Sequence, residues 1–143
     1  MMIRTRIPKC RCEVTMKVKF KNSFHRKAFT AFVSENVKDP YASRYEFVAA
    51  VFLLSADKLL WKRSHGVLTG HSVNFKDLDI TGISTEGYAL FKAAKAVYKG
   101  ESDISLNELC DPDLIDEPTV MTIFAGVALL RNGIGMLNWK VKS

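Results

Sequence analysis

The longest uninterrupted apolar run of the chain is FVAAVFLL, residues 47–54. A helix that crosses a bilayer needs about 20 such residues, so a run this short predicts a buried helix inside a globular core. Ser43 and Glu46 precede and enter this run with the spacing of a capping box, which predicts that the helix begins after Ser43. A segment around residues 57–63 continues or bends the helix before His65-Gly66 ends it.

Apolar residues at helical spacing indicate further helices on both sides of this run. Asp39-Pro40 ends the first of them, and Ser84 and Gly100 are typical of the beginning and end of another. Ser105 with Glu108 predicts a capping box for a short helix, and Asp116 followed by Pro118 predicts the beginning of the last. The apolar positions that mark the three longer helices are Phe24, Ala28, Phe29, Phe32 and Val33; Leu90, Phe91, Ala94, Val97 and Tyr98; and Ile123, Phe124, Val127 and Leu130. Residues 64–83 show mixed patterning, with a short strand predicted at Val67-Leu68 or Val73–Phe75.

Strict alternation of apolar and polar residues from Cys10 to Lys21 predicts a strand with one buried face. A lone strand is unstable, and the alternating C-terminal residues from Leu137 to Lys142 are the natural partner. The predicted fold is therefore mainly α, a compact bundle of five or six helices with a small antiparallel ribbon formed by the N- and C-terminal strands. Residues 1–15 form a basic extension, either a strand or a flexible arm if Met16 is the native start, and residues 16–143 form a single helical domain.

The composition is that of an ordinary globular domain. The chain has 143 residues, of which 48% are hydrophobic and 25% charged. The N-terminus is basic and lacks the apolar segment of a secretory signal, so a cytoplasmic location is expected, with no membrane association. The three cysteines are then expected to be reduced thiols.

Cysteine and histidine residues are the first candidates for a chemical site. Cys10, Cys12 and Cys110 form a tetrahedral zinc site only if the fold brings them together with a histidine, and their spacing is not that of paired zinc ligands. The histidines considered are His25, His65 and His71. Because cysteine is often buried simply as a small apolar residue, we expect no metal and no cofactor.

Catalytic groups are similarly isolated in the sequence. Candidates for nucleophilic chemistry are Ser64-His65 and His71-Ser72 with Asp77 and Asp79, but no nucleophile-elbow pattern surrounds either serine. The acidic residues that precede the last helix suit a divalent cation, although a helix cap and the helix dipole explain Asp116 and Glu117 equally well. These acidic residues are Asp111, Asp113, Asp116 and Glu117. The sequence predicts a protein that is not an enzyme.

The charge is unevenly distributed along the chain. The net charge is +6, but residues 1–30 carry +8 and residues 77–117 carry −7. On the ribbon hypothesis, basic side chains from both ends of the chain form a strip that contacts an anionic partner or nucleic acid. The residues of this predicted strip are Arg4, Arg6, Lys9, Arg11, Lys17, Lys19, Lys21, Lys140 and Lys142.

The order of these motifs resembles a family of small uncharacterised bacterial proteins, a domain of unknown function often found near prophage or other mobile elements. The resemblance covers residues 18–132 and implies a helical fold and a mobile-element setting, but no activity. Its features in order are Phe20 with His25 and Phe29; Asp39-Pro40-Tyr41; Ile83-Ser84-Thr85; Ala89-Leu90 and Ala93-Ala94; Val97-Tyr98-Lys99-Gly100; and a helix that ends in Leu130-Arg131.

Three functional hypotheses follow from the sequence. The first is a small non-enzymatic binding protein that docks a protein partner, as a phage or mobile-element accessory factor such as an inhibitor of host defence of the anti-CRISPR type. The second is a nucleic-acid-binding protein that uses the basic strip. The third is an enzyme whose active site has no recognisable motif. The identity of the partner and the oligomeric state are left open by the sequence.

Overall fold

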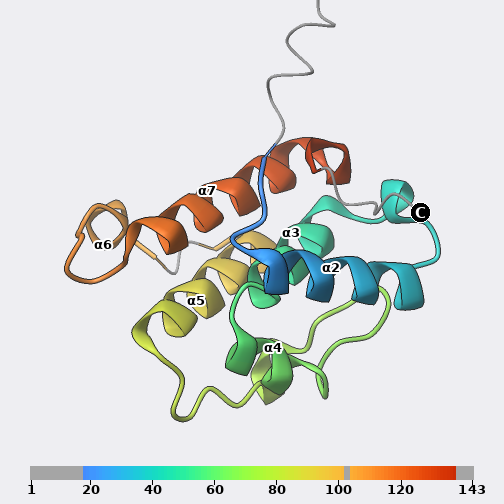
Figure 1. Cartoon of the computed structure of the whole chain (residues 1–143). Helices are drawn as coiled ribbons and strands as arrows, with labels where there is room; N and C mark the ends of the chain where they lie inside the picture. The colour runs from blue at the N-terminus through green and yellow to red at the C-terminus, as the bar shows by residue number, and fades with distance from the viewer. Residues whose placement is uncertain (1–17, 102–103, 138–143) are drawn as a thin grey trace, which may run out of the picture.

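The computed structural model describes residues 18–101 and 104–137. Over this part of the chain the protein is helical, with six α-helices and three short 3-10 helices (Figure 1). The α-helices are α2 (Ser23–Asn36), α3 (Tyr45–Leu54), α4 (Lys58–Ser64), α5 (Thr85–Lys99), α6 (Leu106–Leu109) and α7 (Glu117–Asn132). The 3-10 helices are η1 (Pro40–Ala42), η2 (Phe75–Asp77) and η3 (Ile134–Met136). The mainly α prediction with five or six helices is confirmed for the described residues.

Helix α3 is the centre of the core, as its apolar run predicts. Every residue from Phe47 to Leu54 is buried. The helix packs mainly against α5 and α7, which also contact each other, while α2 and α4 cover it further. Figure 1 shows α2 in front of α3, with α5 and α7 on either side. An all-round apolar helix is stable only in such an enclosed position, because each face removes apolar surface from water.

The helix ends follow the sequence signals at most positions. The side chains of Asp57, Ser84 and Asp116 accept hydrogen bonds from backbone N–H groups in the first turns of α4, α5 and α7. Ser105 and Glu108 form the expected capping box of α6. Helix α5 ends at Gly100, whose φ of 76° is a left-handed conformation that glycine adopts without strain.

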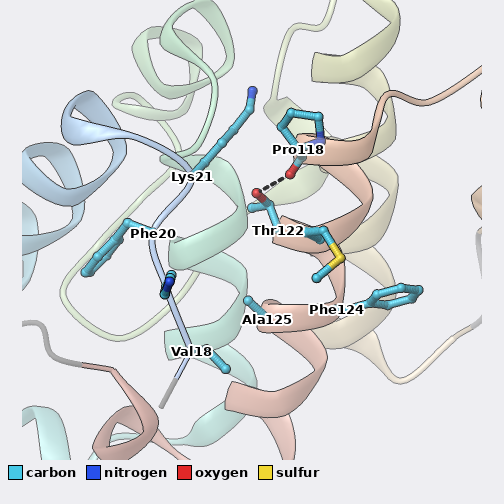
Figure 2. Close-up of a pocket in the computed structure, with 9 residues that line it drawn as sticks. Val18, Phe20, Lys21, Pro118, Thr122, Phe124 and Ala125 are labelled. Carbon is cyan, nitrogen blue, oxygen red and sulfur yellow. Dashed lines mark hydrogen bonds between the residues drawn. The ribbon is translucent and has the colours of Figure 1, made fainter. Parts of the chain in front are cut away.

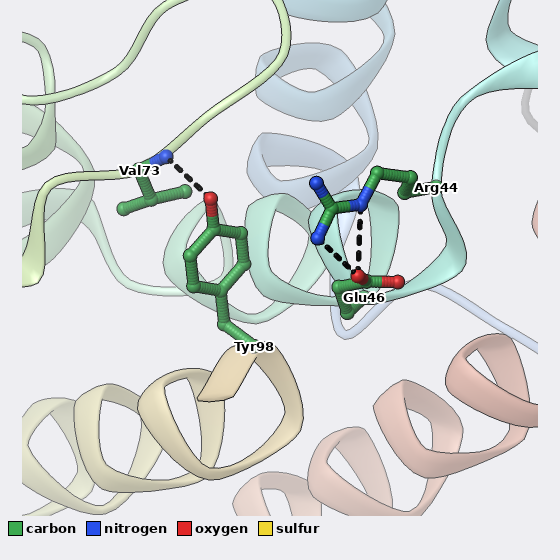
Figure 3. A network of polar contacts seen from close by, with 4 residues as sticks. All are labelled: Arg44, Glu46, Val73 and Tyr98. Atoms are coloured by element: carbon green, nitrogen blue, oxygen red, sulfur yellow. Dashed lines mark hydrogen bonds and ion pairs between the residues drawn. The ribbon is translucent and has the colours of Figure 1, made fainter. Parts of the chain in front are cut away.

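The predicted capping box of α3 is wrong. The residue before the helix is Arg44, and Ser43 donates its hydroxyl hydrogen bond to the carbonyl of Asp39 instead. Glu46 pairs with the Arg44 guanidinium, whose Nη2 lies 2.6 Å from Glu46 Oε2 (Figure 3). The turn η1 displaces Ser43 from the helix, because Pro40 fixes the backbone in a separate 3-10 turn.

The segment between α4 and α5 contains no extended strand. Leu68 and Val73, one from each of the two predicted short strands, form a single antiparallel bridge. The hydroxyl of Tyr98 on α5 accepts a hydrogen bond of 3.3 Å from the Val73 backbone N–H (Figure 3). Phe75 is buried and packs on Phe91 and Tyr98, so the segment is held to α5 by aromatic contacts.

The predicted antiparallel ribbon is also corrected. Within the described residues no strand forms, and Val18 and Leu137 make one isolated bridge that is parallel. The Val18 N–H donates to the carbonyl of Met136 at 2.8 Å. The two ends of the described chain therefore meet as predicted, but the bridge between them has the opposite direction to the predicted pairing. Residues 19–21 of the predicted ribbon are described and form no strand, and residues 10–17 and 138–142 lie outside the described residues.

Candidate docking surface

Helix α7 turns a face with several small residues toward the core and leaves three large apolar residues exposed. Thr119, Thr122, Ala125 and Gly126 are on the buried side of the helix. A Cβ atom placed on Gly126 would lie 2.8 Å from the side chain of Leu53, so α3 and α7 approach closely at this point. Ile123 and Leu129 are buried as well, so the exposed large apolar residues of α7 are confined to the outer side of the helix.

Three large apolar side chains project from that outer side. Met121 is 56% exposed, Phe124 50% and Val127 49%. They are spaced three residues apart, so they lie on adjacent turns and form one continuous patch, which we call the α7 surface. Single exposed apolar residues are common, but a continuous patch of this kind is typical of an interaction site.

A groove runs beside the α7 surface. Its volume is about 550 Å³, and it lies between α7 and the segment that precedes α2 (Figure 2). Met121 and Phe124 belong to the α7 surface and also border the groove, whereas Thr122 and Ala125 are buried at its inner side. The groove is lined by Val18, Lys19, Phe20, Lys21, Pro118, Met121, Thr122, Phe124 and Ala125.

The segment Val18–Lys21 forms the second wall of the groove and is anchored at both ends. Val18 is held by its backbone hydrogen bond to Met136. At the other end the Lys21 N–H donates to Nδ1 of His25 at 2.9 Å. Between these points the Phe20 ring contacts the rings of His25, Phe29 and Phe52. The wall is therefore fixed to the core by hydrogen bonds and aromatic packing rather than by a sheet.

His25 is a fully buried histidine whose two ring nitrogens are both used. Because Nδ1 accepts from the Lys21 N–H, the proton is on Nε2, which donates to the carbonyl of Phe52 at 2.7 Å. Burial lowers the pKa of His25 from 6.5 to about 4; the hydrogen bond to Phe52 opposes this shift and the nearby charge of Lys21 adds to it. His25 is thus neutral at neutral pH and positions the groove wall.

Two of the predicted basic residues lie on this groove. Lys19 is exposed and Lys21 is half-buried, and both are on the wall opposite α7. Within the described part of the chain Lys19 makes no ion pair. The other members of the predicted strip fall outside the described residues: Arg4, Arg6, Lys9, Arg11, Lys17, Lys140 and Lys142.

The acidic residues before α7 have structural roles. Asp116 caps the helix by accepting from the Thr119 N–H at 3.0 Å. The Thr119 hydroxyl, its N–H and the charge of Lys21 together hold the pKa of Asp116 below its usual value. Asp111 accepts from the Asp113 N–H in the preceding turn. The interpretation of Asp116 as a helix cap, rather than as a cation ligand, is the one that these contacts favour.

The candidate catalytic and metal-binding residues are dispersed. The Ser64 hydroxyl is buried and donates to the carbonyl of Leu60, and His65 bonds to the carbonyl of Trp61. Asp79 pairs with Arg63 at 3.2 Å. No three of the described histidine, cysteine, aspartate and glutamate residues form a group able to hold a metal ion. Cys110 is exposed, and Cys10 and Cys12 lie outside the described residues.

Comparisons with protein-family models, with curated proteins and with solved structures give no match to this chain. Among the described residues, none of the helices combines the length and apolar character needed to cross a membrane. The resemblance to a family of uncharacterised bacterial proteins stays a prediction, and the α7 surface has to be interpreted from its own chemistry.

The sequence pattern of α7 does not by itself reveal this surface. Phe124 and Val127 are among the apolar residues that mark the helix in the sequence, yet they face outward while Ile123 and Leu129 are buried. The available signal is the set of small residues: threonine, alanine and glycine at four positions of one face indicate a close helix contact there. That contact leaves Phe124 and Val127 on the side of the helix that faces away from the core.

Proposed function

We propose that the protein is a non-enzymatic binding protein that docks a segment of another protein chain on the α7 surface and its groove. The observation that carries this proposal is the continuity of Met121, Phe124 and Val127 with an apolar groove fixed to the core. Binding energy at protein interfaces concentrates in a few large side chains set in a ring of weaker contacts, and Phe124 at the centre of the patch fits that role.

The chemistry of the partner segment follows from the two walls of the groove. The α7 wall offers apolar side chains at helical spacing, which suits an amphipathic helix or an extended segment with spaced apolar residues. The opposite wall offers the cationic side chains of Lys19 and Lys21. A segment that carries apolar anchors beside aspartate or glutamate residues therefore matches both walls.

Selection of random displayed peptides on the immobilised full chain tests this proposal. We expect enriched peptides to combine spaced apolar residues with carboxylates. A synthetic copy of such a peptide is expected to bind Phe124→Asp at least tenfold more weakly, equivalent to about 1.4 kcal/mol. The matched control is Leu106→Asp, which places the same charge at an apolar side chain that is 76% exposed on α6. Absence of any peptide whose binding depends on Phe124 would overturn the proposal.

Binding of nucleic acid is the alternative function, and the Phe124→Asp variant also separates it from protein docking. Labelled duplex and single-stranded DNA are titrated at low and moderate salt with the wild type, Lys19→Glu and Phe124→Asp. Salt-sensitive binding that is lost in Lys19→Glu and unchanged in Phe124→Asp would contradict protein docking in favour of phosphate contacts. We expect no such binding by the described residues, because only Lys19 and Lys21 of the predicted basic strip are among them and the α7 wall that faces them is apolar.

A further inference from the structure

One line of residues on α7 has an unusual arrangement. Glu117, Met121, Phe124, Ala128 and Arg131 follow one another at intervals of four, three, four and three residues. At about 100° per residue, all five lie within roughly 80° of one another around the helix axis. Ala128 is half-buried and the other four are exposed, so this line is the outer edge of the helix.

The charges of this line are antisymmetric about Phe124. Glu117 precedes Phe124 by seven residues and Arg131 follows it by seven. Met121, three residues before Phe124, and Val127, three residues after it, lie about 60° to either side of Phe124 around the helix axis. When the helix is reversed about Phe124, Arg131 takes the place of Glu117 and Phe124 stays at the centre. Such a face is complementary to itself when one copy is reversed.

We propose that α7 pairs in antiparallel orientation with α7 of a second copy of this chain, about a two-fold axis at Phe124. This inference rests on the proposed function, because it names a second copy as an occupant of the same surface. Phe124 meets its counterpart on the axis, and Met121 of each copy lies at the same level along the helix pair as Val127 of the other. The exposed apolar area of both copies is then removed from water at once.

The charged ends fix the direction of pairing. Glu117 and Arg131 are separated by about 21 Å along the helix, at 1.5 Å per residue, and this length is the same in both copies. Antiparallel pairing therefore brings each Glu117 beside an Arg131 of the other copy. Parallel pairing would set glutamate against glutamate and arginine against arginine, which is repulsive at both ends.

The pairing surface is compatible with the surrounding structure. The small side chain of Ala128 allows the two helix backbones to approach. Helix α7 forms an outer layer of the bundle (Figure 1), and the Phe124 side chain points away from the groove segment (Figure 2). A single helix pair forms an interface at the small end of the usual range, so we expect a weak and reversible dimer.

Sedimentation of the full chain tests the pairing. Between about 1 µM and about 1 mM protein, we expect the mass to rise from the 16.1 kDa monomer toward twice that value. Phe124→Asp places two like charges on the axis and is expected to stay monomeric over the same range. Leu106→Asp is the matched control and is expected to dimerise like the wild type.

Charge exchange tests the antiparallel direction. Glu117→Arg and Arg131→Glu are each expected to weaken association roughly tenfold, since two like-charge contacts replace two ion pairs. The double variant Glu117→Arg/Arg131→Glu restores both pairs, and an equimolar mixture of the two single variants forms mixed dimers. Glu35→Arg on the exposed side of α2 is the control for a change in net charge alone. The double variant carries both substitutions. If it dimerises again, the weaker association of the single variants cannot be explained by misfolding.

A wild type that remains monomeric at every concentration overturns the inference, and Phe124-dependent peptide binding by that monomer would leave the proposed docking function standing. Association that persists in Phe124→Asp, or a double variant that is no better than the single variants, also overturns it. Recovery in the double variant supports the antiparallel arrangement, because parallel pairing gives no recovery on exchange of the two charges.

Discussion

Acidification is expected to destabilise the fold through His25. The unfolded chain has a histidine pKa near 6.5, and burial lowers the folded value to about 4. A lowered histidine pKa means that the unfolded state takes up the proton first as the pH falls. The contribution of His25 to the free energy of unfolding is therefore fully present above pH 6.5, and it is lost as the pH falls toward 4.

The size of the effect follows from the difference between the two pKa values. Each unit of pKa difference corresponds to about 1.36 kcal/mol, so His25 alone accounts for about 3.4 kcal/mol when both states are protonated. At pH 5 the expected loss relative to pH 7 is about 2 kcal/mol. The structural cause is the burial of the ring, which disfavours the charged imidazolium, with a smaller contribution from the nearby charge of Lys21.

Urea unfolding between pH 7 and pH 5 measures this loss, because most carboxylates remain ionised in that interval. The variant His25→Gln removes the titrating group, and its free energy of unfolding is expected to change with pH by about 2 kcal/mol less than that of the wild type. His71→Gln, at an exposed histidine, is the control and should follow the wild type. Equal pH dependence in His25→Gln and the wild type would refute the assignment.

Three further changes test the packing around α7. Gly126→Ala is expected to destabilise the fold in urea, because its Cβ meets Leu53 at 2.8 Å and overpacking costs about 1–3 kcal/mol against about 1 kcal/mol gained in helix propensity. Gly66→Ala, with open space at its Cβ, is the control, and equal stability of the two variants would contradict the close contact. Asp116→Ala is expected to cost about 1 kcal/mol through loss of the α7 cap, and an unchanged urea midpoint would argue against that role. Phe124→Asp is expected to change the free energy of unfolding by less than about 0.5 kcal/mol, as is usual for exposed positions, and a larger loss would show that the ring supports the fold.

Helix positions were predictable because their signals are local. Ser84, Ser105 and Asp116 begin helices in the structure as they do in the sequence, since a side-chain cap depends only on the next three residues. Ser43 fits the same pattern and fails, because Pro40 gives the preceding residues a turn of their own. The terminal ribbon failed for a related reason: alternation indicates an extended chain but does not specify the direction of its partner.

The candidate site depended on information that is not local. The sequence identified Lys19 and Lys21 as members of a basic strip, but not the apolar groove that they border. Phe124 and Val127 belong to the apolar pattern of α7, and periodicity alone gives them the same status as Ile123. His25 likewise has no sequence signal that separates a buried histidine from a surface one, because its environment is supplied by Phe20 and Phe52.

The amino-acid sequence alone determined that the chain is helical, where its longer helices begin and end, and that residues 47–54 form the centre of the core. These features are set by backbone hydrogen bonding and by the period of apolar residues, both of which act over a few positions. Only the tertiary structure decided which face of α7 is covered. The close approach of α3 leaves no room for a side chain at Gly126 and so fixes which face of α7 is turned inward; Met121, Phe124 and Val127 are then on the outside of the molecule.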